Sequence, residues 1–151
     1  MIGKLIIETI ASAIGTIGFS VLFGIPRKLY LNCALIGAVG WLMYKGALLL
    51  GVGMSTAVFL AAVVIVLASR FTAVYRQCPA TVFLIAGIFP LVPGAQIYWA
   101  AYYLVTNQFD NALSSGFTAL KVMIAIVLGI VFVFEIPYKV FAIARPRKKA
   151  K

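Results

Sequence analysis

Long apolar runs separated by short polar breaks make up most of the chain. Five such runs lie at residues 5–25, 29–44, 52–69, 80–105 and 117–138. Each reaches or approaches the ~20 residues that a helix needs to cross the hydrocarbon core of a bilayer. We therefore predict an all-α integral membrane protein, a bundle of about five transmembrane helices. Four is the alternative, because the second run is short enough for a re-entrant segment.

The same pattern leaves room for one domain. We expect residues 1–144 to form a single transmembrane domain and residues 145–151 a basic cytoplasmic tail. The small triplet at residues 11–13 resembles a signal-peptide cleavage site, but the apolar stretch before it is short and is interrupted by Glu8. The first run is therefore expected to be a retained helix.

Small residues recur four positions apart in the first two runs. The pairs are Ala11 with Gly15 and Cys33 with Gly37. Such pairs allow the backbones of neighbouring helices to approach closely. They favour packing within this bundle, with docking to another subunit as the alternative.

The fourth run carries Pro90, Pro93 and Gly94 near its centre, so it cannot be one unbroken helix. The two prolines would leave the carbonyl groups of Ala86 and Phe89 without their usual amide donors. We expect two half-helices of about ten residues, each roughly 15 Å long, with the break near the middle of the membrane.

Helix breaks at that depth are common substrate sites in transporters. The amide groups of Gly94, Ala95 and Gln96 would begin the outer half-helix, where positive partial charge suits a carboxylate. Gln96 and Tyr98 are the polar side chains nearest the break. A proline kink that only shapes the bundle is the alternative.

Composition supports the membrane interpretation. Hydrophobic residues make up 64% of the 151 positions and charged residues 11%, unlike soluble domains, which are roughly half apolar and a quarter charged. The chain has three acidic residues and no histidine, which argues against a metal site or a histidine-based catalytic site. We predict that the protein is not an enzyme and uses no cofactor.

The net charge of +10 does not indicate nucleic acid, because the cations cluster in the breaks and the tail. A cytoplasmic C-terminus places ten cations inside and leaves Lys4, Lys45 and Lys121 at the outer side. The positive-inside rule therefore predicts an outer N-terminus in a prokaryotic plasma membrane. The basic tail is expected to contact anionic lipid.

Three charged residues near the membrane are candidates for function. Glu8 shares a helical face with Lys4, so an ion pair is expected, with proton coupling as the alternative. Glu135 precedes Lys139 by four residues, and the same two interpretations apply. Lys121 lies about one turn inside the fifth run, so it reaches either the outer interface or a substrate carboxylate.

The segment Pro90-Leu91-Val92-Pro93-Gly94, followed by Tyr98, also resembles the threonine/serine exporter family. The stretch at residues 36–41 after Pro26-Arg27-Lys28 adds to the resemblance, which covers nearly the whole chain. The chain is similar to the family's short-subunit branch, which corresponds to the C-terminal membrane half of full-length exporters. The family commonly has a further glycine where this chain has Ala95-Gln96.

The resemblance implies a small membrane subunit of a secondary exporter that works with a larger membrane subunit. Its cargo would be small carboxylate-bearing metabolites, threonine and serine first and a dicarboxylate such as succinate second. The residues themselves, independently of the resemblance, suggest as substrate-binding candidates Pro90, Pro93, Gly94, Ala95, Gln96 and Tyr98 at the break, together with Lys121. The alternatives are an accessory or scaffold membrane protein, and a homo-oligomer in place of the larger partner.

Overall fold

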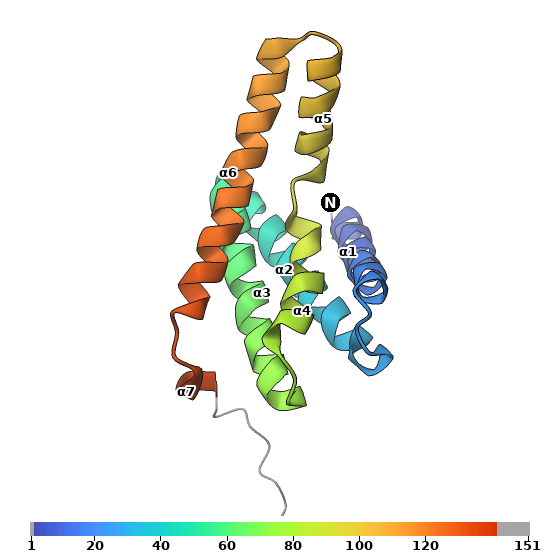
Figure 1. Ribbon diagram of the computed structural model, residues 1–151, viewed down its shortest axis with the longest axis vertical. Coiled ribbons are helices and arrows are strands. Elements are labelled where there is room, and N and C mark those ends of the chain that lie inside the picture. The colour runs from blue at the N-terminus through green and yellow to red at the C-terminus, as the bar shows by residue number, and fades with distance from the viewer. Residues whose placement is uncertain (1, 142–151) are drawn as a thin grey trace, which may run out of the picture.

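The computed structural model describes residues 2–141, and every regular element in that part of the chain is a helix (Figure 1). In chain order the elements are α1 (Ile2–Leu22), η1 (Arg27–Leu29), α2 (Tyr30–Leu49), α3 (Met54–Arg76), α4 (Ala80–Ile88), η2 (Phe89–Leu91), α5 (Gly94–Val105), α6 (Phe109–Phe134) and α7 (Tyr138–Phe141).

Four helices are long and apolar enough to cross a membrane, and the bent pair formed by α4–η2 and α5 provides a fifth span if it is counted as one. The prediction of an all-α membrane bundle with a broken fourth helix is therefore confirmed. The second run was the one least certain to span the membrane. Together with its preceding turn it forms the 23-residue segment Arg27–Leu49, which is long and apolar enough to do so.

Several helices end at different residues from those expected. Helix α2 continues through Lys45 to Leu49, α3 runs past Ser69 to Arg76, and α6 begins at Phe109 instead of Phe117. The physical reason is that a polar residue interrupts an apolar run without interrupting a helix. Near a helix end, a long charged side chain can reach the interface while its backbone stays helical.

The helix ends follow a common backbone motif instead. Gly24, Gly51, Gln77 and Asn107 all have positive φ, between 55° and 79°. After each of them, the next amide group reaches back five residues, as in Ile25 N–H to Ser20 O and Val52 N–H to Ala47 O. This is the Schellman arrangement, which satisfies carbonyl groups at a helix C-terminus.

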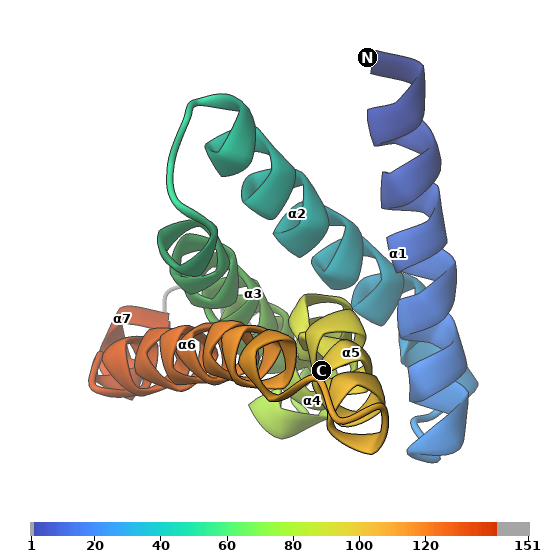
Figure 2. The same ribbon diagram turned by 90° about the horizontal axis from the view of Figure 1, so that it is seen from above.

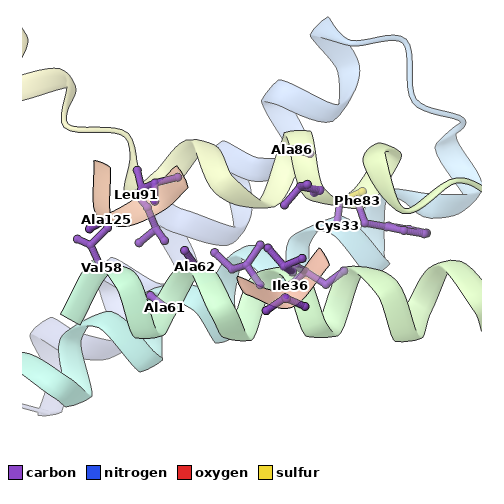
Figure 3. Packing of buried hydrophobic residues seen from close by; sticks show 14 of the residues in the cluster. Cys33, Ile36, Val58, Ala61, Ala62, Phe83, Ala86, Leu91 and Ala125 are labelled. Atoms are coloured by element: carbon purple, nitrogen blue, oxygen red, sulfur yellow. The ribbon is translucent and has the colours of Figure 1, made fainter. Parts of the chain in front are cut away.

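Helix α3 lies at the centre of the bundle, in contact with α2, α4 and α6, whereas α1 lies at one edge against α2 (Figure 2). Small and branched side chains fill the core. In Figure 3, Leu91 of η2 lies close to Val58 of α3 and Ala125 of α6. At Gly129 of α6 a Cβ would meet the Ala62 Cβ at 2.8 Å, so this glycine lets α6 approach α3 closely.

The α1–α2 interface is polar but closely packed. Ser12, Thr16 and Ser20 are buried along one face of α1, and the Ser12 hydroxyl donates to the Gly37 carbonyl at 3.2 Å. A Cβ at Gly37 would overlap the Thr16 side chain, which confirms close packing at that glycine. Ala11 and Gly15 are exposed on α1 and do not form the close contact expected of them.

Helix α5 packs mainly against α6 and has no buried residue. Figure 1 shows α5 and the first half of α6 standing beyond the other helices. This hairpin therefore leaves much of its surface free for lipid or for another polypeptide.

Candidate functional site

The break in the fourth span is a short, ordered turn. Helix α4 ends at Ile88, the 3-10 turn Phe89–Leu91 follows, and Val92 is extended before α5 begins at Gly94. The two helical parts are bent by 52°. Pro93 is the N-cap of α5, a place where its missing amide donor removes no helical hydrogen bond.

The turn satisfies part of the backbone that we expected to be free. The Phe89 carbonyl accepts from the Val92 amide at 3.1 Å, so it is not the unpaired acceptor predicted from the sequence. The Gly94 amide donates to the Val92 carbonyl at 2.8 Å. The amides of Ala95 and Gln96 remain in the first turn of α5, where a helix has no carbonyl of its own to offer.

Aromatic contacts fix the turn in place. The Phe89 ring stacks on Phe19 of α1 with centroids 3.8 Å apart, and Phe23 lies 5.5 Å from the same ring. Leu91 is 5% exposed and belongs to the core. The break is therefore held between α1 and the centre of the bundle.

A cavity of about 170 Å³ opens beside the break. Three other helices contribute to its wall, with Trp41 and Tyr44 from α2, Met54 and Val58 from α3, and Val122 from α6. From the break itself come Pro90, Leu91, Val92, Pro93, Gly94, Ala95 and Gln96. A Cβ at Gly94 would meet no other atom within 4 Å, so the glycine borders open space.

The positions of its lining residues along α6 and α3 show how deep this cavity lies in the bundle. Val122 lies near the middle of α6, about 20 Å from either end at the helical rise. Met54 is the first residue of α3. The cavity is thus level with the centre of the longest span and with the end of α3 that we expect to be the outer one.

A second cavity, of about 260 Å³, lies on the α1 side of the break and shares Trp41 and Pro90 with the first. Glu8, Ala11, Ser12, Gly15 and Phe19 of α1 complete its wall. The break therefore separates two adjoining cavities.

Glu8 forms an ion pair between helices. Its Oε2 lies 2.8 Å from Nζ of Lys45 on α2. The prediction that Glu8 pairs with Lys4 on the same helix is therefore wrong, because its direct partner is Lys45. The reason is tertiary, because α2 continues as a helix through Lys45 and brings its ammonium group to α1.

The structure brings Pro90, Pro93, Gly94, Ala95 and Gln96 together at one cavity, with Glu8 at the adjoining one. Three other predicted residues lie elsewhere. Tyr98 is 62% exposed and packs against Trp99 and Tyr102 of its own helix. Lys121 borders a separate groove with Ser55 and Thr56, and Glu135 is exposed at the C-terminal end of α6. The expected partner of Glu135 is Lys139, whose side chain is outside the described residues.

Sequence reasoning missed three side chains of this region, Trp41, Tyr44 and Lys45. The second apolar run was expected to end before Lys45, and Lys45 was assigned only to the outer side of the membrane. The available signal was their spacing, since residues three and four apart share one helical face. The Lys45 ammonium lies 5.3 Å from the Trp41 ring centroid, and the Trp41 and Tyr44 rings are 5.4 Å apart.

Comparison with known proteins adds a family assignment. The profile of the family described as "Threonine/Serine exporter, ThrE" matches residues 8–136. An uncharacterized protein of Haemophilus influenzae is 28% identical over 148 residues, covering 95% of this chain and 50% of that protein. The chain thus spans about half the length of the curated relative that it matches. No solved structure matches it.

Proposed function

The chain belongs to the threonine/serine exporter family, and on that premise we propose that it is the small membrane subunit of a secondary exporter for small carboxylate-bearing metabolites. Threonine and serine are the first candidates for the cargo. Family membership points to transport as the class of function, and the apolar helices make the protein a multi-pass membrane protein. We place it in a prokaryotic plasma membrane, with the N-terminus outside and the C-terminus in the cytoplasm.

The cavity at the broken helix is the observation that carries this proposal. Non-helical backbone inside a membrane is tolerated where it is buried in protein or borders a water-filled cavity. Here it borders a cavity with the amides of Ala95 and Gln96 at a helix N-terminus, which suits a carboxylate group. Pro90, Pro93 and Gly94 shape this wall, and Gln96 adds a polar side chain.

A dicarboxylate such as succinate is the second candidate cargo. The same cavity supports it, because helix-terminal amides recognise the carboxylate and not the rest of the molecule. The presence of Ala95-Gln96, where the family commonly has a further glycine, leaves the choice between amino acid and dicarboxylate to experiment. Lys121 and Tyr98 stay predictions as substrate residues, as do Glu135 and Glu8 as proton-coupling residues.

A larger membrane subunit of the same family would complete the transporter. Two observations support this partner: the match to about half of a longer relative, and the unburied surface of α5. A homo-oligomer is the alternative, and a non-transporting accessory protein is the alternative at the level of function. Contact of residues 145–151 with anionic lipid also stays a prediction, because the tail is outside the described residues.

Gly94→Val and Gln96→Leu test the site. A valine at position 94 points into open space, so it should fill the cavity without disturbing the fold. Each change should lower cellular export of threonine or succinate about fivefold or more at an unchanged protein level, because a misplaced ligand loses the geometry it needs.

Val127→Leu is the matched control, since Val127 is 56% exposed on α6 and lines none of the cavities at the break. It should export at the parental rate. If both cavity variants reach the membrane and export like the parent, the break is architectural and the site assignment is wrong. If deletion of the chain leaves export intact, the transport function itself is wrong.

A further inference from the structure

The Glu8–Lys45 ion pair lies between the second and third of three adjoining cavities. A cavity of about 170 Å³ is lined by Lys4, Leu5, Glu8, Lys45 and Leu49. Glu8 also lines the 260 Å³ cavity, which in turn shares Trp41 and Pro90 with the cavity at the break. A ligand leaving the break toward this end of α2 would therefore pass Trp41 and then the ion pair.

Two hydrogen-bond donors of α2 converge on this path. Trp41 and Lys45 are four residues apart, so they share one face of the helix. The Lys45 ammonium binds Glu8, whereas the buried Trp41 indole N–H interacts with the Glu8 carboxylate without reaching full hydrogen-bond geometry. A buried unpaired donor is destabilising, so a ring without that N–H would suit the free protein better.

An ammonium and an adjacent indole N–H match the two oxygens of one carboxylate. Glu8 pairs directly with the ammonium and only weakly with the indole N–H. We propose that Lys45 and Trp41 form a carboxylate-binding site between α1 and α2, and that Glu8 occupies it until the carboxylate of the transported ligand displaces it. This inference deepens the proposed function and rests on it for the chemical class of the ligand.

A second lysine can pair with the Glu8 carboxylate once it is displaced from Lys45. Lys4 lies four residues before Glu8 on α1, lines the same cavity and attracts the Glu8 carboxylate. Exchange between Lys45 and Lys4 keeps the acidic side chain paired in both states. This limits the cost of releasing a charge within a largely apolar span.

The space available fits a small metabolite. The 260 Å³ cavity corresponds to roughly nine waters at about 30 Å³ each, which is enough room for a four-carbon acid. Its wall combines apolar groups with few polar ones, as is usual for small-molecule sites. The Ser12 hydroxyl already donates to the Gly37 carbonyl, which leaves Trp41 on this wall, and Lys45 on the wall of the adjoining cavity beside Glu8, as the donors for an anion.

Fluorescence of Trp41 gives a binding measurement that is independent of transport. The chain has two tryptophans, so Trp99→Phe leaves Trp41 as the only reporter. The full chain in phospholipid nanodiscs would be titrated with threonine and succinate and with the amides that lack their carboxylate charge, threoninamide and succinamide. We expect a saturable change with the acids, and binding about tenfold weaker with the amides because the charged contact is lost.

Replacing the two members of the ion pair should change the affinity for acids in opposite directions. Lys45→Gln should weaken acid binding about tenfold, Lys45→Arg should restore most of it, and Glu8→Gln should tighten it about threefold or more because the internal competitor is gone. A purely structural ion pair predicts equal harm from the loss of either partner. Lys28→Gln, an exposed charge removed from the η1 turn, is the matched control.

Trp41→Phe, followed by calorimetry, should weaken acid binding while the thermal unfolding temperature is kept or raised. Equal effects of Glu8→Gln and Lys45→Gln, acids no better than amides, or parental export by Lys45→Gln would each overturn the proposed site. Selective acid binding in a chain whose deletion leaves export intact would instead support the site and refute the transport function.

Discussion

At the scale of single residues, Arg70 follows the third apolar run in the sequence, but in the structure it lies within α3 and its side chain contacts the end of α6. Its Nη1 donates to the carbonyl oxygens of Val133 at 2.6 Å and Ile136 at 2.9 Å. Pro137 has no amide, so the Val133 carbonyl lacks its usual helical donor four residues on. The guanidinium group also lies 4.3 Å from the Phe141 ring centroid. Arg70 therefore joins the C-terminal part of α3 to the end of α6.

Replacement of Arg70 should destabilise the bundle. Arg70→Gln removes the charge that strengthens these hydrogen bonds and should lower the free energy of unfolding by about 2 kcal/mol, while Arg70→Lys should retain part of it. Thermal unfolding of the purified protein in detergent measures the loss. Arg76→Gln removes the same charge, an exposed hydrogen bond to Asn32 and a cation–π contact with Tyr75 on its own helix. It should cost clearly less, and an equal cost for both changes would contradict the assignment.

At the scale of elements, hydropathy located the helices, and backbone conformation determined their ends. The break at residues 90–94 was predictable because two prolines and a glycine act on the backbone directly. The continuation of α2 through Lys45 was not, because its ammonium is stabilised by Glu8 of another helix. Similarly, α3 continues past Ser69 through Arg70, which is stabilised by the end of α6.

Helix α5 also combines a feature set by local sequence with one set by tertiary contacts. Its start after Pro93 follows from local sequence, whereas the exposure of Tyr98 depends on which neighbours surround the helix. Tyr98, Trp99, Tyr102 and Tyr103 pack on one another along α5 instead of lining the cavity. Spacing along the chain placed Tyr98 near the break but could not give the direction of its side chain.

At the scale of the whole molecule, the charge asymmetry predicts the orientation in the membrane. Single cysteines at Lys28 and Asn111, both exposed, would be introduced after Cys33→Ala and Cys78→Ser. In intact cells an impermeant maleimide should label position 111 and spare position 28, while permeabilised cells should show both. Labelling at position 28 with protection at position 111 would reverse the orientation.

The partner proposal predicts that the chain is incomplete alone. In proteoliposomes that contain only this polypeptide, saturable efflux of threonine or succinate should be absent, and addition of the larger subunit should establish it. Size analysis of the reconstituted particles distinguishes the alternatives. Efflux by a monomer would refute the need for a partner, and efflux by a homo-oligomer would replace the larger subunit with further copies of this chain.

The sequence by itself determined the membrane class, the approximate spans and the broken fourth helix. These follow from apolar length and from proline, which act locally. Only the tertiary structure decided that Lys45 binds Glu8, that Trp41 lies beside Pro90 and that Tyr98 faces away. Such contacts depend on the angles at which helices cross and on where each helix ends, and those are set by the packing of distant residues against one another.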